Sequence, residues 1–212
     1  MIKQMSSIVL AGGKSQRYGS NKAIAELEGK TLISLSFNAL NPLVNELIVV
    51  VASHEQAKLL PLEDKVKVVV DQYPNCGSLG GIYSGLDEIK NEWAFVSACD
   101  MPFLNQNLIT NMAELRDGHD IVAPIIENRP EPTHAMYRKS CLKSINKQLN
   151  SGELKITKFY NEMNVKEVHS DFIDKIDPGR WSFFNVNTPE DMIKAKQNYQ
   201  LSKLDHHDEY SK

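Results

Sequence analysis

Short runs of consecutive hydrophobic residues, rich in β-branched side chains, recur along the first 125 residues. Each is followed by a stretch in which apolar residues return at helical spacing. The apolar runs predict β-strands at 7–11, 47–52, 66–70, 93–98 and 121–123, and the helical stretches predict helices at 32–40, 55–60, 79–89 and 107–115. Strands that are apolar throughout are typical of parallel sheets covered on both faces by helices. The pattern therefore predicts an α/β fold with three layers, α/β/α, around a mostly parallel sheet.

The chain is organised as a single predicted domain. Its 212 residues contain no repeat and no flexible linker, and this length is enough to bury a core without disulfides or a structural metal. We predict a domain over residues 1–200, with an N-terminal half of about 1–125, a less regular half of about 126–200, and a polar tail at 201–212. A final helix is predicted to begin at Pro189, with Thr188 as its N-cap and acidic residues in its first turn.

Composition excludes several classes of protein. The chain carries 24 Lys and Arg against 27 Asp and Glu, a net charge of −3, which does not favour binding to nucleic acid. No apolar run approaches the roughly 20 residues needed to cross a bilayer, and no export signal is recognisable near Met1. Cys76, Cys99 and Cys141 are odd in number and far apart, as is usual in a reducing compartment. We therefore predict a cytoplasmic protein that binds neither nucleic acid nor membrane.

A glycine-rich segment with basic residues follows the first predicted strand. It reads L-A-G-G-K-S-Q-R-Y-G over residues 10–19, and Lys22 comes shortly after. Glycines let backbone amides approach an anion, which Lys14, Arg17 and Lys22 would neutralise, so the segment predicts a phosphate-binding loop. Ile8 stands where a Walker A loop needs its first glycine, and the dinucleotide-binding glycine spacing is also absent. The alternative is a turn with solvated basic side chains.

Aspartates follow two of the predicted strands. Asp71 and Asp100 each stand where an apolar run stops, and ligands of open α/β sheets bind at the carboxyl ends of strands. One or two carboxylates plus substrate phosphates are the usual ligands of Mg²⁺, so we predict Mg²⁺ as cofactor and Asp100 as its ligand. The alternative is that each aspartate caps the turn that follows it. A D-x-D metal motif is excluded because Pro102 occupies its second acidic position.

Two further segments are candidates for ligand contacts. The sequence N-C-G-S-L-G-G-I at 75–82 opens a predicted helix whose first amides are suited to a base or phosphate, unless it is merely a loose connection. Asn185 and Asn187 alternate along an extended segment, so both could read the edge of a heterocycle such as a pterin. Alternatively, each bonds its own backbone before the final helix. His134, alone among apolar neighbours, is predicted to be structural.

These segments resemble those of the molybdenum cofactor guanylyltransferases, the MobA family. Residues 10–22 are similar to its L-A-G-G-x-S-x-R-M-G-x-x-K loop with Tyr18 for Met, and residues 77–81 to G-P-L-x-G with Ser78 for Pro. Residues 99–102 resemble C-D-x-P, residues 132–137 P-x-x-A-x-Y, and residues 185–191 N-x-N-T-P-E-D. Some members carry an asparagine near the nucleotide after the second strand, where this chain reads A-S at 52–53. Either Ser53 replaces this contact or the contact is missing.

The resemblance implies a Rossmann-like nucleotidyltransferase fold and transfer of GMP from Mg-GTP to molybdopterin, with release of pyrophosphate. It implies Lys22, Arg17 and Asp100 as catalytic residues and Asn185 and Asn187 as acceptor-binding residues. The predicted nucleotide-binding residues are Leu10, Ala11, Gly12, Gly13, Lys14, Lys22, Asp71, Gly77, Leu79 and Asp100. Partners would be GTP and molybdopterin, together with other proteins of molybdenum cofactor biosynthesis and molybdoenzymes.

Other functions stay open at this point. Cytidylyl transfer to the same pterin and sugar-phosphate nucleotidyl transfer are the enzymatic alternatives, and the N-x-N-T-P form of residues 185–189 favours guanylyl transfer. The other class is a non-catalytic nucleotide-binding module. Lys22 and Asp100 argue against it, because simple binding needs no metal carboxylate.

Overall fold

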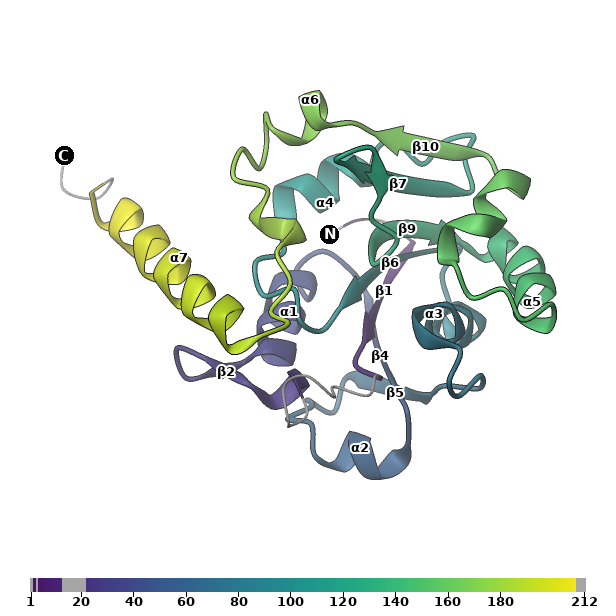
Figure 1. The fold of residues 1–212 in the computed structure, drawn as a ribbon, viewed down its shortest axis with the longest axis horizontal. Helices are drawn as coiled ribbons and strands as arrows, with labels where there is room; N and C mark the ends of the chain where they lie inside the picture. Colours follow the sequence, from purple (N-terminus) through teal and green to yellow (C-terminus); the bar gives the residue numbers. More distant parts are fainter. Residues whose placement is uncertain (1, 3, 13–21, 209–212) are drawn as a thin grey trace.

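The computed structural model describes residues 2, 4–12 and 22–208, with side chains to residue 201. Eight strands of this part form one sheet in the order β10-β7-β9-β6-β1-β4-β5, with β8 paired to β7 (Figure 1). These strands are β1 (Met5–Leu10), β4 (Glu46–Val51), β5 (Val66–Val70), β6 (Trp93–Ala98), β7 (Ile121–Ile126), β8 (Arg129–Pro130), β9 (His134–Arg138) and β10 (Val165–Val168). A separate hairpin consists of β2 (Glu26–Leu27) and β3 (Lys30–Thr31).

The sheet is mostly parallel, as predicted. Strand β1 lies at its centre and pairs in parallel with β4 and β6, while β4 pairs with β5 and β7 with β10 in the same sense. Two strands are exceptions: β9 lies antiparallel between β6 and β7, and the short β8 pairs antiparallel with β7. The sequence pattern did not predict β9 or β10. The four buried residues of β9 begin with His134, so no purely apolar run marks this strand.

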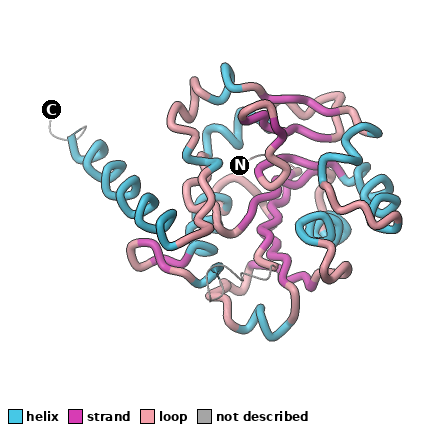
Figure 2. The backbone as a smooth tube through the Cα atoms, in the orientation of Figure 1, coloured by secondary structure: helices cyan, strands magenta, loops and turns pink. Residues whose placement is uncertain are grey.

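Helices cover both faces of the sheet, which confirms the three-layer α/β prediction (Figure 2). They are α1 (Leu32–Leu40), α2 (His54–Lys58), α3 (Gly77–Glu88), α4 (Gln106–Ala113), α5 (Leu142–Asn150), α6 (Ser170–Ile173) and α7 (Pro189–Asp208). Short 3₁₀ helices occupy Lys22–Ile24, Lys139–Cys141, Ile156–Glu162 and Trp181–Phe183. Side chains of β1 alternate between the faces: Val9 packs in the cluster that contains α1 and α4, whereas Ile8 and Leu10 pack in the cluster of α3 and α5.

Glycines bring α3 into direct contact with β1. A Cβ atom at Gly85 would lie 2.6 Å from Ile8 Cγ2, and one at Gly81 would lie 3.0 Å from Leu10 Cδ2. A larger residue at Gly85 would clash with the β-branched side chain of Ile8, and one at Gly81 would require Leu10 to move. The close approach places the first turn of α3 beside the carboxyl end of β1.

The final helix begins as predicted. Thr188 Oγ1 accepts a hydrogen bond from Asp191 N, and Asp191 Oδ2 accepts from the backbone N of Asn187 and of Thr188. Helix α7 then extends away from the body of the protein as far as Asp208, past the predicted start of the polar tail at residue 201 (Figure 1). None of the helices within the described ranges is both long enough and apolar enough to cross a membrane.

Candidate active site

The glycine-rich segment leaves the sheet between two neighbouring strands. Leu10 O accepts a hydrogen bond from Cys99 N after β6, and Val50 O of β4 accepts from both Ala11 N and Gly12 N. The first residues of the segment are therefore fixed at the carboxyl ends of three parallel strands, the usual ligand site of an open α/β sheet. The predictions for Gly13, Lys14 and Arg17 lie outside the described residues.

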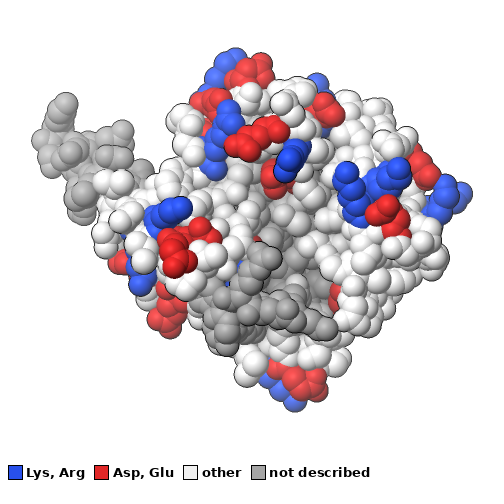
Figure 3. All heavy atoms as spheres, in the orientation of Figure 1, with Lys and Arg blue, Asp and Glu red and all other residues white. Residues whose placement is uncertain are grey.

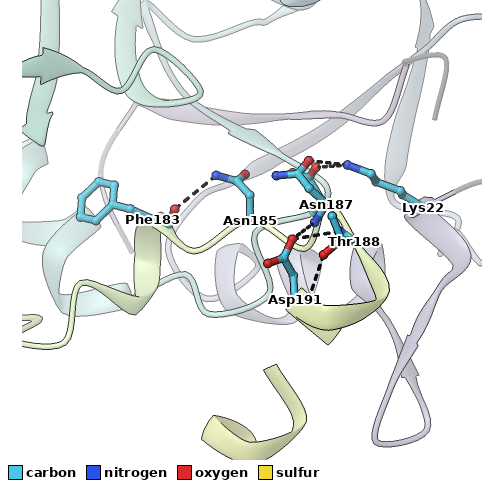
Figure 4. A network of polar contacts seen from close by, with 7 residues as sticks. Lys22, Phe183, Asn185, Asn187, Thr188 and Asp191 are labelled. Carbon is cyan, nitrogen blue, oxygen red and sulfur yellow. Dashed lines mark hydrogen bonds and ion pairs between the residues drawn. The ribbon is translucent and has the colours of Figure 1, made fainter. Parts of the chain in front are cut away.

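Lys22 brings together two of the other predicted site residues. Its Nζ lies 3.0 Å from Asp100 Oδ2. It also lies 2.6 Å from Asn187 Oδ1, and Figure 4 shows the side chains of Lys22 and Asn187 pointing toward one another. The side chains of Lys22 and Asp100 are each only 16% exposed, so water screens this ion pair less than it screens a surface pair. Three residues predicted from separate motifs thus meet at one point. The prediction had assigned Asn187 to the acceptor alone, and the structure adds its contact with Lys22.

One of the two carboxylate oxygens of Asp100 has no hydrogen-bond partner among the described residues. Its Oδ2 bonds to Lys22, while its Oδ1 is buried and has no hydrogen-bond partner within the described part of the chain. A buried carboxylate oxygen without a partner is unfavourable, and a hard cation is one of the few groups that satisfy it. Among the described residues there is no group of three or more His, Cys, Asp or Glu side chains placed to hold a metal. A single carboxylate fits Mg²⁺ that arrives with substrate phosphates as its other ligands.

Asp71 has a different environment. Its Oδ1 accepts hydrogen bonds from Tyr73 N at 2.9 Å and from Ser84 Oγ at 3.0 Å, which tie the turn after β5 to α3. No hydrogen bond in the described ranges joins Asp71 to Lys22 or Asp100. The structure therefore shows the turn-capping role for this oxygen, and the predicted nucleotide contact stays a prediction.

The first turn of α3 has no side-chain cap. Cys76 occupies the N-cap position without a capping bond, and Gly77 follows with a φ of +60° that favours glycine. Leu79 is fully buried in the core, and its predicted nucleotide contact stays a prediction. A Cβ atom at Gly80 would lie 2.8 Å from Tyr73 O, which shows how closely the turn after β5 packs on this helix.

The two asparagines of the N-x-N segment have different partners. Asn185 Nδ2 donates to Phe183 O at 3.2 Å within its own segment, whereas Asn187 Oδ1 accepts from Lys22 (Figure 4). Val186 between them is fully buried, and its N–H donates to Asp100 O at 2.9 Å. The segment is thereby attached to the loop after β6.

His134, Cys99 and Cys141 are not placed for acid–base or nucleophilic catalysis. His134 is fully buried between the rings of Phe95 and Phe183, and neither ring nitrogen has a hydrogen bond of ordinary length and angle to a described residue. Burial lowers its pKa to about 3, against a smaller raising effect of the Ser182 backbone, so it is neutral at pH 7. Burial likewise raises the pKa values of Cys99 and Cys141 to about 12. These groups are structural, as the sequence predicted for His134.

Sequence reasoning missed Gln56. Its Oε1 accepts from Ala52 N at 2.7 Å and its Nε2 donates to Ala11 O at 2.8 Å. Ser53, which was considered as a nucleotide contact, caps α2 by accepting from Gln56 N at 3.2 Å. Ser53-x-x-Gln56 matches a helix-capping pattern and was the available signal for this site.

Charge is mixed on the face of the molecule drawn in Figure 3. Described lysines and arginines lie among aspartates and glutamates there and do not gather into one basic surface. The positive charge of Lys22 is therefore a local feature of the site, partly buried beside Asp100.

Comparisons with known proteins identify the family of the chain. Residues 7–167 match the family described as MobA-like NTP transferase domain. The chain is 38% identical over 201 residues to a probable molybdenum cofactor guanylyltransferase of Natranaerobius thermophilus, covering 93% of this chain and 97% of that protein. It is 34% identical over 202 residues to the molybdenum cofactor guanylyltransferase of Desulfosudis oleivorans, covering 94% and 98%.

Solved structures of nucleotidyltransferases are similar to this chain. Molybdopterin-guanine dinucleotide biosynthesis protein A of Archaeoglobus fulgidus superposes with a TM-score of 0.81 at 27% identity, covering 92% of this chain and 98% of that one. A 2-C-methyl-D-erythritol 4-phosphate cytidylyltransferase of Thermus thermophilus has a TM-score of 0.67 at 12% identity, covering 92% and 98%, which indicates a shared fold.

Proposed function

Since this chain belongs to the family of MobA-like NTP transferase domains, we propose that it transfers GMP from GTP to the terminal phosphate of molybdopterin and releases pyrophosphate. The observation that carries the proposal is the contact of Lys22 with both Asp100 and Asn187. It joins a cation next to the glycine-rich segment, a carboxylate at the end of β6 and an amide of the C-terminal segment at one point. A nucleotidyl transfer needs groups of these kinds around its reacting phosphate.

The proposed reaction requires the protein to position the reactants and to neutralise charge, and it requires little covalent chemistry from the protein. An oxygen of the molybdopterin phosphate attacks the α-phosphorus of GTP, a P–O bond forms, and the bond to the β-phosphate oxygen breaks. The attacking phosphate is already an anion, so no general base has to remove a proton. Positioning and neutralisation of charge are then the main contributions of the protein.

We assign Lys22 to neutralising the negative charge that builds on the phosphates, the leaving pyrophosphate above all, during transfer. Among the described residues its ammonium is held by two oxygens, Asp100 Oδ2 and Asn187 Oδ1, which leaves a third N–H that could donate to a phosphate oxygen. Arg17 is assigned the same kind of role on the triphosphate from its place in the sequence motif. Asp100 would hold Mg²⁺ through its unpaired Oδ1, and the ion, when bound, supplies positive charge to the phosphate oxygens.

The nucleotide and the acceptor are assigned to opposite sides of Lys22. On the nucleotide side, the backbone of residues 10–13 and the first turn of α3 from Gly77 to Leu79 are assigned to GTP, together with Lys14 and Asp71 from their places in the sequence motifs. On the acceptor side, Asn185 and Asn187 contact molybdopterin. The bond from Val186 N to Asp100 O brings the acceptor segment to the carboxylate, which supports an acceptor site next to the nucleotide site.

The proposed setting is the cytoplasm. Cys76, Cys99 and Cys141 are all free thiols in the described chain, which is the usual state of cysteine in that compartment. Other proteins of molybdenum cofactor biosynthesis, and molybdoenzymes that receive the product, are the proposed protein partners.

Nucleotide selectivity followed by turnover tests the proposal. Binding of GTP, CTP, ATP and UTP is measured by calorimetry with and without Mg²⁺, and pyrophosphate release is then followed after addition of molybdopterin. We expect the tightest binding for GTP with Mg²⁺, and pyrophosphate release only when molybdopterin is present. Preference for CTP would make the enzyme a cytidylyltransferase, and tight GTP binding without any transfer would indicate a nucleotide-binding module.

A further inference from the structure

The hydrogen-bond ladder between β1 and β4 is interrupted where the two strands leave the sheet. In a parallel pair with Leu10 opposite Val50, Ala11 N bonds to Val50 O, as observed, and the next bond would run from Ala52 N to Ala11 O. In this chain both of those groups bond to the carboxamide of Gln56 instead. The side chain takes the place of one backbone rung, with its oxygen towards Ala52 and its nitrogen towards Ala11.

This inserted amide lies directly beside the first glycine of the loop. Gly12 follows Ala11, and a Cβ atom at Gly12 would lie 3.3 Å from Ala52 N, the group that Gln56 holds. Gly12 N also shares Val50 O with Ala11 N. The direction in which the chain leaves β1 is therefore set by the two bonds of Gln56 together with the contact between Gly12 and Ala52.

The position of Gln56 is itself fixed by local structure. Ser53 caps α2 through Gln56 N, and this short helix begins directly after the exit of β4. The carboxamide is half-buried and uses both its acceptor and a donor on backbone groups. A hydrocarbon side chain can make neither bond, and a shorter side chain would let Ala52 N close onto Ala11 O.

The geometry points to Gln56 as a positioning residue for nucleotide binding: its carboxamide holds β1 and β4 apart by one rung and thereby aims the Ala11–Gly12 backbone at the triphosphate. This inference rests on the proposed function, because the ligand of that backbone is taken to be a nucleoside triphosphate. Gln56 acts through Ala11 and Ala52, and no contact with the ligand is assigned to it.

Two substitutions and a matched control test the inference. Gln56→Met keeps the length of the side chain without its polar groups, and Gln56→Ala lets the ladder close. Gln106→Met is the control, because Gln106 Nε2 also donates to a backbone carbonyl, that of Ala39 at 3.0 Å, on a helix outside the site. For each variant we measure the Kd of GTP with Mg²⁺, the melting midpoint, the KM of molybdopterin, and hydrogen exchange of the Ala52 amide.

We expect both Gln56 variants to bind GTP at least fivefold more weakly, with melting midpoints within about 3 °C of wild type and an unchanged KM for molybdopterin. The Ala52 amide should exchange faster in Gln56→Met and remain protected in Gln56→Ala. A Kd raised less than fivefold in both variants, or a similar loss in Gln106→Met, overturns the inference. If one variant does not fold, the other decides by the same criterion.

Failure of the inference can be told apart from failure of the proposed function. If wild type prefers another nucleoside triphosphate, the proposed function fails, and the Gln56 variants are then compared on that nucleotide. If wild type binds GTP and transfers GMP while Gln56→Met and Gln56→Ala bind GTP equally well, only the positioning role fails.

Discussion

Val186 N donates a hydrogen bond to the carbonyl oxygen of Asp100 at a distance of 2.9 Å. This bond attaches the C-terminal segment to the end of β6, and the next residue, Asn187, extends its side chain to Lys22. The groups assigned to the nucleotide and those assigned to the acceptor therefore belong to one connected network. A substitution that removes a member of this network, such as Asn187, is therefore expected to affect both sides.

Asp100→Ala should reduce GMP transfer by more than tenfold and leave the fold intact. The carboxylate balances the charge of Lys22 and provides the unpaired oxygen, whereas its side chain adds little to the core. Initial rates of pyrophosphate release measure the loss, and circular dichroism checks the fold. Glu162→Ala is the control, because Glu162 pairs with Lys147 on the surface, and it should stay within twofold of wild type. If Asp100→Ala keeps more than about a tenth of wild-type activity, the loss of transition-state stabilisation is below about 1.4 kcal/mol and Asp100 is not essential.

Lys22→Ala should lower the transfer rate by a larger factor than it weakens GTP binding. The ammonium matters most where negative charge builds on the leaving pyrophosphate, a state that exists only during reaction. Single-turnover rates and the Kd of GTP are compared with those of Lys147→Ala, whose lysine also pairs with a carboxylate but lies on the surface. Equal losses in rate and affinity would assign Lys22 to ground-state binding.

Single substitutions of Asn185 and Asn187 should have different kinetic effects. Asn185→Ala should raise the KM of molybdopterin and leave GTP binding within about twofold, because Asn185 makes no described contact with Lys22. Asn187→Ala should raise this KM and also lower the transfer rate, because it removes one of the two oxygens that hold Lys22.

Stability has to be checked beside these measurements. Both residues precede the Thr188 cap of α7, and loosening that cap costs about 1 kcal/mol and would imitate a defect in the site. A melting curve of each variant resolves this point. Identical kinetic effects of Asn185→Ala and Asn187→Ala, with unchanged melting midpoints, would refute their different roles.

His134 should make the stability of the protein depend on pH. Its folded pKa of about 3 lies below the ordinary value near 6.5, so between these values the unfolded chain binds a proton that the folded chain does not. The stabilisation is complete above pH 6.5 and falls as the pH is lowered towards 3. Relative to His134→Leu, wild type should lose about 2 kcal/mol of unfolding free energy between pH 7 and pH 5. Urea unfolding at a series of pH values measures this, and parallel curves for the two proteins would contradict it.

Much of the framework was predictable because it depends on local pattern. Continuous apolar runs identified β1, β4, β5, β6 and β7, and the Thr188-Pro189 signal identified the start of α7. Strand β9 was not predicted because it begins with a buried histidine, and nothing in the neighbouring sequence indicates its antiparallel pairing. The region from Lys139 to Lys175 gave no usable pattern, yet it supplies α5 and β10.

In the site, the residues were predictable and their contacts were not. Lys22, Asp100 and Asn187 were identified from motifs, but Lys22 and Asn187 are 165 positions apart, and only the fold shows that they touch. Gln56 was missed for a related reason. The Ser53-x-x-Gln56 spacing indicates a helix cap, but the bonds of Gln56 to Ala52 and Ala11 depend on how two neighbouring strands part, which the sequence does not show.

The strand order has a consequence for how the protein is made. A ribosome releases β1, β4, β5 and β6 first, then β7, and only later β9, which must enter between β6 and β7. Until β9 emerges, β6 presents unpaired N–H and C=O groups along one side, a surface on which other nascent chains can add strands. A gene truncated after β7 would therefore be expected to give aggregates, not a smaller nucleotide-binding protein. The antiparallel strand ties completion of the sheet to synthesis of the second half of the chain.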